Sequence, residues 1–145
     1  MKRNILMFVV TLMISVAFAF SAPMALAKDM TFKDFAAVAY QNITQISPAD
    51  AKGLLDNGGA VFFDVREQDE FNAGHIPGAK NAPRGTVEVA IPKAIPDKNA
   101  PIIIYCEHGS RGALATYALV QMGYKNVKNL EGGRAAWMKA GFPGK

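Results

Sequence analysis

The feature that most constrains the fold is an abrupt change of sequence character within residues 102–112. Residues 102–105 are Ile-Ile-Ile-Tyr, and such a β-branched and aromatic run is typical of a parallel strand buried on both faces. Cys106, the only cysteine of the chain, follows directly, and the sequence from Ser110 onward has helical composition. The residues between them therefore form a short turn from a strand's carboxyl end into a helix, where open α/β sheets place their ligand crevice.

This turn is suited to hold a reactive sulfur atom. Unpaired backbone N–H groups of residues 107–112 would point around the sulfur, and Gly109 permits the positive φ that such a curl requires. These amides and the cation of Arg111 would stabilise a thiolate. The residues alone also allow a second interpretation, in which Cys106 is a small buried hydrophobic side chain.

Residues 106–111 and three further stretches form an ordered set of motifs. The set consists of Cys106-x-x-Gly109-x-Arg111, the pattern DVRE…EF…GHIPGA at 64–79, Asn-Ala-Pro-Arg-Gly at 81–85, and Leu-Glu-Gly-Gly-x-x-x-Trp at 130–137. It resembles the signatures of the rhodanese (thiosulfate sulfurtransferase) family, and we expect a rhodanese-like domain at 43–145. The resemblance implies an α/β fold of three layers, with a central, mostly parallel five-stranded sheet flanked by helices.

The resemblance also implies a sulfurtransferase. Cys106 would attack the outer sulfur of a donor such as thiosulfate, hold it as a persulfide, and pass it to a thiol or cyanide acceptor. A protein could also serve as donor or acceptor. Arg111 would supply positive potential beside the sulfur, and Arg84 would lie near the mouth of the pocket. No cofactor or metal is expected. The substrate-binding cradle would consist of Glu107, His108, Gly109, Ser110 and Gly112.

Glu107 departs from many thiosulfate-using relatives, which carry a basic or neutral residue directly after the nucleophile. A carboxylate about 6 Å from a thiosulfate dianion would cost roughly 1–3 kcal/mol at an effective dielectric between about 40 and 80. If Glu107 faces the donor, thiosulfate should be a poor one, and a less charged or protein-bound donor should be preferred. If Glu107 points into solvent, it should matter little.

Two other polar residues of the motifs are assigned structural roles. Asp64 ends the expected strand 60–65, where it would cap the following turn or pair with Arg66. His75 belongs to a breaker-rich turn at 74–79 that is structural in the family, so we do not expect it to act as a base.

Two other functions are compatible with the same loop. Phosphatases and arsenate-reducing relatives have a similar Cys/Arg loop but, by family resemblance, need five residues between the two, whereas four separate Cys106 from Arg111. A persulfide carrier, or a non-enzymatic binding or redox module, could use the same fold. The sequence shows no Lys/Arg cluster typical of nucleic-acid binding and no residues with metal-ligand spacing.

The first 27 residues have the organisation of a secretory signal peptide. Lys2 and Arg3 precede an uncharged apolar run at 5–20, and Ala-Leu-Ala at 25–27 is an A-x-A cleavage site. The run is shorter than the ~20 residues that span a bilayer. We therefore expect export to the periplasm or the medium, and membrane association only if the segment is retained.

Residues 28–42 form an N-terminal helical extension outside the family core. Thr31 and Asp34 have the spacing of a capping box, and apolar residues follow at helical spacing. The helix would either pack on the surface of the domain or serve as an arm that docks a partner.

The A-x-A motif predicts a defined mature N-terminus. N-terminal sequencing of the exported protein should begin at Lys28, and Ala27→Phe, which removes the small residue at the junction, should retard cleavage. A membrane-bound protein that still begins with Met1 would contradict this prediction.

Overall fold

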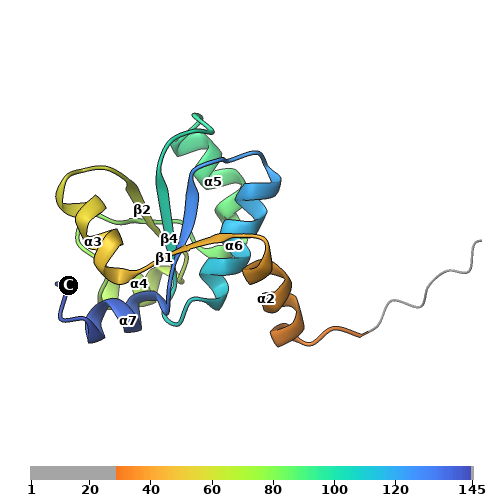
Figure 1. Cartoon of the computed structure of the whole chain (residues 1–145), viewed down its shortest axis with the longest axis horizontal. Coiled ribbons are helices and arrows are strands. Elements are labelled where there is room, and N and C mark those ends of the chain that lie inside the picture. The colour runs from red at the N-terminus through yellow and green to blue at the C-terminus, as the bar shows by residue number, and fades with distance from the viewer. Residues whose placement is uncertain (1–28, 145) are drawn as a thin grey trace, which may run out of the picture.

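The predicted strand at 102–105 lies at the centre of a five-stranded sheet. The structure, a computed structural model, describes residues 29–144 (Figure 1). The strand order is β1-β5-β4-β2-β3, and every neighbouring pair is parallel. The strands are β1 (Thr44–Ile46), β2 (Val61–Asp64), β3 (Lys80–Asn81), β4 (Ile102–Tyr105) and β5 (Val127–Leu130). The expected α/β fold with a five-stranded sheet is confirmed.

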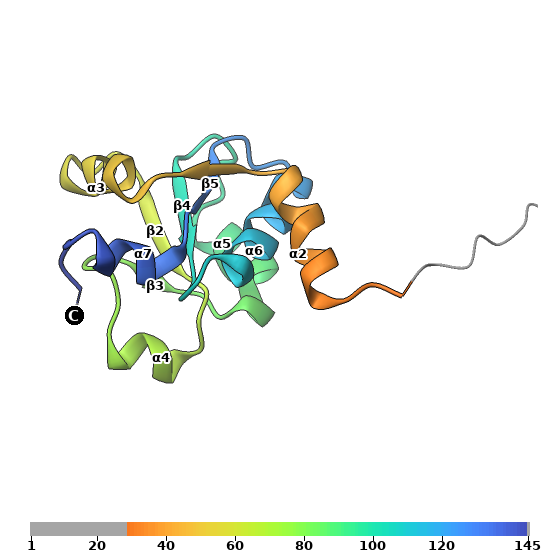
Figure 2. The same cartoon turned by 60° about the horizontal axis from the view of Figure 1, so that its bottom comes forward.

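Helices cover both faces of this sheet. Figures 1 and 2 show α5 and α6 on one side, α3 and α7 on the other, and α2 on the outer side of α6. The helical elements are α2 (Phe32–Gln41), α3 (Pro48–Asp56), α4 (Gln68–Ala73), the short 3₁₀ helix η2 (Arg84–Thr86), α5 (Val87–Ala94), α6 (Ser110–Gln121) and α7 (Gly133–Lys139). The chain therefore has the three layers that the resemblance implied.

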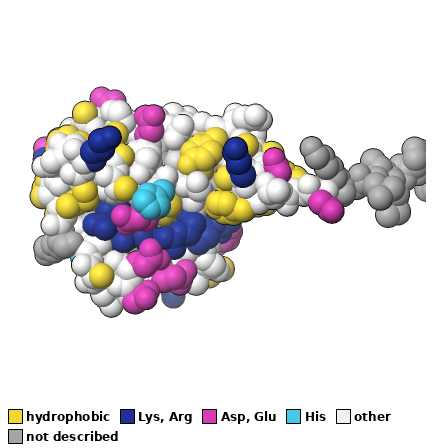
Figure 3. Space-filling view, turned by 90° about the horizontal axis from the view of Figure 1, so that it is seen from below, with side chains coloured by type: hydrophobic (Ala, Val, Ile, Leu, Met, Phe, Trp, Pro, Cys, Tyr) yellow, Lys and Arg dark blue, Asp and Glu magenta, His cyan; other side chains and the backbone are white. Residues whose placement is uncertain are grey.

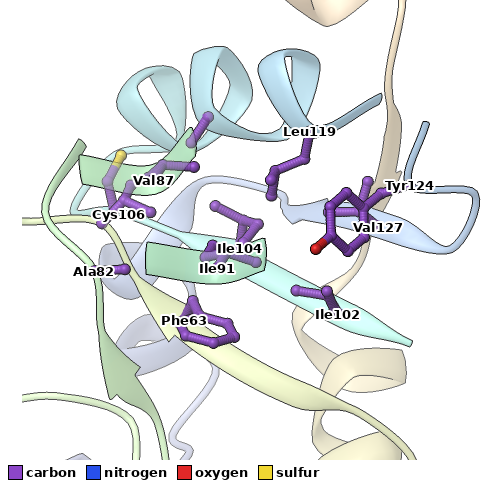
Figure 4. Packing of buried hydrophobic residues seen from close by; sticks show 12 residues of the cluster. Phe63, Ala82, Val87, Ile91, Ile102, Ile104, Cys106, Leu119, Tyr124 and Val127 are labelled. Carbon is purple, nitrogen blue, oxygen red and sulfur yellow. The ribbon is translucent and has the colours of Figure 1, made fainter. Parts of the chain in front are cut away.

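The alternation of side chains along β4 divides the core into two clusters. Ile102 and Ile104 pack with residues of α5 and α6, and Cys106 continues this alternation at the end of the strand (Figure 4). Ile103 and Tyr105 point to the opposite face, where they pack with residues of α3 and α7. Both faces of the strand are thus buried, which explains why its sequence is apolar without interruption.

Three local features complete the description of these elements. Helix α5 is continuous through Pro92, because this proline lies in its last turn, where only one backbone hydrogen bond is lost. Strand β5 starts at Val127, and the hydroxyl of Tyr124 before it donates to the Ile95 carbonyl at 2.6 Å. Helix α2 ends at Gln41, directly after the last apolar residue of its helical spacing.

The start of α2 confirms the predicted capping box. The Thr31 hydroxyl accepts from the Asp34 amide at 3.2 Å, and the Asp34 carboxylate accepts from the Thr31 amide at 3.0 Å. The predicted signal peptide lies outside the described residues. Among residues 29–144, no helix has both the length and the apolar character needed to cross a membrane.

Trp137 provides a test of the second core cluster. Its ring lies edge-on to Phe62 and Phe142, with centroid distances of 6.2 and 5.1 Å, and its Nε1 donates to the Pro143 carbonyl at 2.8 Å. Trp137→Ala should lower the free energy of unfolding by about 3–5 kcal/mol, because it leaves a cavity in a fully buried site. In denaturant titration the control Met138→Ala, at a side chain that is 43% exposed, should change it by less than about 0.5 kcal/mol.

Candidate active site

The loop after β4 curls around the sulfur of Cys106. The Gly109 amide donates to Sγ at 3.2 Å, and Gly109 has a φ of 99°, so the predicted positive φ is confirmed. The thiol is 2% exposed and packs with Ala82 and Val87 (Figure 4). Cys106 is therefore both a member of the core and the acceptor of a backbone hydrogen bond, so the two interpretations of this residue coexist.

The N-terminus of α7 holds the opposite side of the loop. The amide of Arg134 donates to the Cys106 carbonyl at 2.8 Å, and the amide of Ala135 donates to the Glu107 carbonyl at 2.9 Å. Gly133 has a φ of 63°, and a Cβ at this position would overlap the carbonyl oxygens of Cys106 and Glu107. Gly133 thus allows the helix to approach the loop backbone closely, whereas a Cβ on Gly132, with a φ of 66°, would overlap Ala136 of α7 itself.

A buried guanidinium connects the end of β2 to the loop. Arg66, which is 3% exposed, donates from Nη2 to Asp64 at 2.6 Å and to the Gly74 carbonyl at 2.6 Å, and from Nη1 to Glu107 at 3.1 Å. Burial alone would lower the pKa of Arg66, but the Asp64 hydrogen bonds and the charges of Asp64 and Glu107 outweigh it and raise the pKa. The Asp64 carboxylate also accepts from the Arg66 amide at 3.0 Å, so the structural role predicted for Asp64 is confirmed.

The carboxylate of Glu107 lies between two arginines. It accepts from Arg134 Nε at 2.8 Å and from Arg66 Nη1 at 3.1 Å. The Glu107 side chain is 27% exposed. The repulsion expected between an uncompensated Glu107 and thiosulfate therefore does not arise, because two guanidinium groups balance the carboxylate. The inference that thiosulfate is a poor donor loses its basis.

Arg111 is held by an acidic side chain from α4. Its Nη1 and Nη2 donate to the two carboxylate oxygens of Glu70 at 2.7 and 2.8 Å. The Glu70 hydrogen bonds raise the pKa of Arg111 despite partial burial, and the neighbouring Cys106 adds to this rise. In turn the Arg111 hydrogen bonds hold the pKa of Glu70 at about 2. The cation predicted at the far end of the loop is thus fixed in place and lies close to the sulfur.

The other predicted site residues differ in their exposure and in their contacts. His108 is exposed, Ser110 begins α6, and Gly112 is buried where a Cβ would overlap the side chain of Asn129. Arg84 pairs with Glu88 one turn further on, at 2.8 Å. Figure 3, seen from below the view of Figure 1, shows charged side chains of both signs intermixed in one band at this end of the molecule.

His75 makes the structural contacts expected of it. Its ring stacks on Phe71 with a centroid distance of 3.8 Å, and its Nδ1 lies 2.9 Å from the Phe71 carbonyl oxygen. The next amide, that of Ile76, donates to the Tyr105 hydroxyl at 3.1 Å and ties this turn to the central strand.

Sequence reasoning did not identify Glu70, Arg134 or Tyr40 as neighbours of the loop. Glu70 stands in the "EF" of the motif at 64–79, and its place in this motif could have marked it as a partner for Arg111. Arg134 occupies an unspecified position of the Gly-Gly-x-x-x-Trp motif, and Tyr40 lies in the N-terminal extension, so no pattern pointed to either. Among residues 29–144, no three potential metal-ligating side chains form a cluster.

Comparison with known families decides the relationship of the chain. The Rhodanese-like domain family matches residues 47–140, which is more than half of the sequence. The chain belongs to the rhodanese-like family. The match includes the active-site loop, strands β2 to β5 and all of α7, and it begins just after β1.

Individual relatives agree with this assignment. The chain is 37% identical over 93 residues to thiosulfate sulfurtransferase GlpE of Pseudomonas fluorescens, covering 64% of this chain and 83% of that one. The human single-domain sulfurtransferase TSTD1 superposes with a TM-score of 0.62 at 32% identity, covering 66% and 95%. A Rhodopseudomonas palustris protein of unknown function, described as a possible tyrosine phosphatase, superposes with a TM-score of 0.73 at 31% identity, covering 83% and 98%. The sulfurtransferase relatives place the chain in a sulfurtransferase family.

The Glu70–Arg111 pair predicts a specific dependence of stability on pH. The pKa of Glu70 is lowered from 4.5 to about 2, so the stability that the pair contributes is complete above pH 4.5 and is lost as the pH falls from there toward 2. Both side chains are about one-third exposed, which limits the contribution to roughly 1 kcal/mol or less.

Thermal unfolding between pH 2 and pH 6 should therefore separate wild type from Glu70→Gln. The midpoint difference should be largest at pH 6 and should shrink as the pH approaches 2, whereas Asp69→Asn on the same helix should show no such trend. A wild-type advantage that is constant across this pH range would mean that the pair does not act through charge.

Proposed function

We propose that the protein transfers sulfane sulfur through a persulfide on Cys106, with thiosulfate as a competent donor and cyanide or a thiol as acceptor. The observation that carries the proposal is the Gly109 amide, which donates to Sγ at the carboxyl end of the central strand. A fixed backbone donor stabilises negative charge on sulfur without reorganisation, both in the thiolate and in the persulfide.

The transfer proceeds in two displacements at sulfur. The Cys106 thiolate attacks the outer sulfur of thiosulfate, the bond between the two thiosulfate sulfurs breaks, and its electron pair leaves with sulfite. The acceptor then attacks the outer sulfur of the persulfide, and the electron pair of that S–S bond returns to Cys106 as a thiolate. The two half-reactions balance without a cofactor and predict ping-pong kinetics.

Three features favour transfer of a sulfur atom over phosphatase chemistry. The thiol is nearly enclosed, which suits a cargo of one atom better than a tetrahedral phosphate. The guanidinium of Arg111 is occupied by Glu70 on two nitrogens, so fewer of its N–H groups are available to an oxyanion at the sulfur. The loop also retains the four-residue spacing between Cys106 and Arg111.

We further propose that this activity is located outside the cytoplasm. The support is the signal-peptide organisation of residues 1–27, with its basic start, apolar run and A-x-A junction. A donor and an acceptor available in the periplasm or medium would then be required, and a protein partner could fill either role.

Intact-mass measurement after incubation with thiosulfate tests the proposal. The mass should increase by that of one sulfur atom and return to its starting value on addition of cyanide, and Cys106→Ser should abolish both changes while circular dichroism stays unchanged. The serine hydroxyl is no larger than the thiol and can accept from the Gly109 amide in its place, so Cys106→Ser should leave the fold intact.

Three results would contradict the proposal. A mass increase in Cys106→Ser would place the sulfur elsewhere, and hydrolysis of a phosphate ester without sulfur loading would indicate a phosphatase. Neither loading nor turnover with any donor would favour a binding module.

A further inference from the structure

A hollow lies between α2 and the start of α6, directly beside the active-site loop. Its volume is about 310 Å³, and it is lined by Phe32, Lys33, Ala36, Ala37, Tyr40 and Ser110. Five of these six residues belong to α2, and the sixth is the predicted cradle residue at the start of the active-site helix. The hollow therefore adjoins the loop from the side of the N-terminal extension.

The helix that forms this wall is firmly placed although it lies outside the residues that the family matches. Ala36 and Ala39 are buried, a capping box fixes the first turn, and α2 packs along α6. The Tyr40 hydroxyl lies 3.0 Å from the position that a Cβ on Gly109 would occupy. The extension thus reaches the loop that holds the sulfur, and the hollow is preformed.

Part of the apolar face of α2 does not pack against the domain and is exposed to solvent. Phe32 and Phe35 are 62% and 55% exposed, although their spacing predicted a buried face. Figure 3 shows exposed apolar side chains beside the charged band, toward the N-terminal end of the described chain. Aromatic and methyl groups left in water next to a reactive site favour an apolar ligand.

The polar groups of the hollow define the rest of the ligand. Among the ion pairs within residues 29–144, none involves Lys33. A free ammonium at the rim favours a carboxylate. The volume of about 310 Å³ lies at the lower end of small-molecule sites, so it fits a compact molecule and not a folded partner.

We propose that this hollow is the acceptor subsite, and that it takes a small thiol with an apolar body and a carboxylate. The apolar body lies against Phe32 and Ala37, the carboxylate pairs with Lys33, and the thiol end reaches the loop past Ser110. This assignment rests on the proposed sulfur transfer. The acceptor thiolate attacks the outer sulfur of the Cys106 persulfide, forming a new S–S bond, and the electron pair of the broken bond returns to Cys106.

Binding of unreactive probes tests the hollow independently of catalysis. The probes are 4-phenylbutyrate and its uncharged counterpart 4-phenylbutan-1-ol, added to Cys106→Ser while backbone amide NMR shifts are followed. Both should bind saturably with shifts centred on residues 36–40 and 110. Lys33→Gln should weaken the acid about threefold and leave the alcohol unchanged, since an exposed ion pair contributes modestly.

Ala37→Leu should weaken both probes at least tenfold, because its added side chain fills the hollow from an exposed position on α2. Lys93→Gln, at an exposed lysine on α5, is the matched control and should change neither affinity.

Kinetics then test the assignment as acceptor subsite, using the chain in the processed form in which it is isolated from the producing cell. With thiosulfate as donor, kcat/KM for 6-mercaptohexanoate should exceed that for 3-mercaptopropionate and that for 6-mercaptohexan-1-ol. The ratio of kcat/KM for 6-mercaptohexanoate to that for cyanide should fall in Lys33→Gln and Ala37→Leu, and should not change in Lys93→Gln.

The outcomes separate this inference from the proposed function. Sulfur transfer to cyanide with an acceptor ratio that is insensitive to both α2 variants would overturn the subsite and leave the sulfurtransferase intact. Probe binding in a protein that never loads sulfur would overturn both the acceptor assignment and the proposed function. Absence of saturable probe binding would overturn the hollow as a small-molecule site and return α2 to the two roles considered from the sequence, a helix packed on the domain surface or an arm that docks a partner.

Discussion

The buried charge of Arg66 is the constraint on which the active end of the molecule depends. Leaving a buried charge without its partner costs about 3–5 kcal/mol, so its partners must all be in position at once. They come from the end of β2, from the carbonyl of Gly74 and from Glu107 in the loop. One guanidinium thus couples a strand end and the turn at Gly74 to the nucleophile loop, which lies about 40 residues further along the chain.

The loop is held on several sides, which leaves its backbone little freedom. Helix α7 binds the carbonyls of Cys106 and Glu107, α4 binds Arg111 through Glu70, and the tyrosine of α2 abuts Gly109. Preorganised dipoles stabilise a charge better than groups that must first reorient. The enclosed sulfur and the paired arginines are therefore parts of one preorganised arrangement.

The sequence predicted the local features of this site but not the side-chain contacts between its elements. Strand β4, the positive φ of Gly109 and the pairing of Asp64 with Arg66 are local in sequence, so residue type and spacing were enough. The partners of Glu107 and Arg111 lie on other elements, and their contacts depend on how helices pack, which no short pattern encodes. The prediction for Glu107 was wrong for this reason, because it considered the repulsion between the carboxylate and thiosulfate without the two arginines that pair with the carboxylate.

The position of β1 has a consequence for the order in which the molecule can fold. Thr44 near the start of the domain pairs with Lys128 near its end, and β5 lies between β1 and the central strand. The first strand to emerge during synthesis therefore has no neighbour until almost the whole domain is available. Such long-range pairing slows folding, because chain entropy is lost before contacts compensate for it. The sheet of a nascent chain should therefore remain incomplete until β5 has been synthesised.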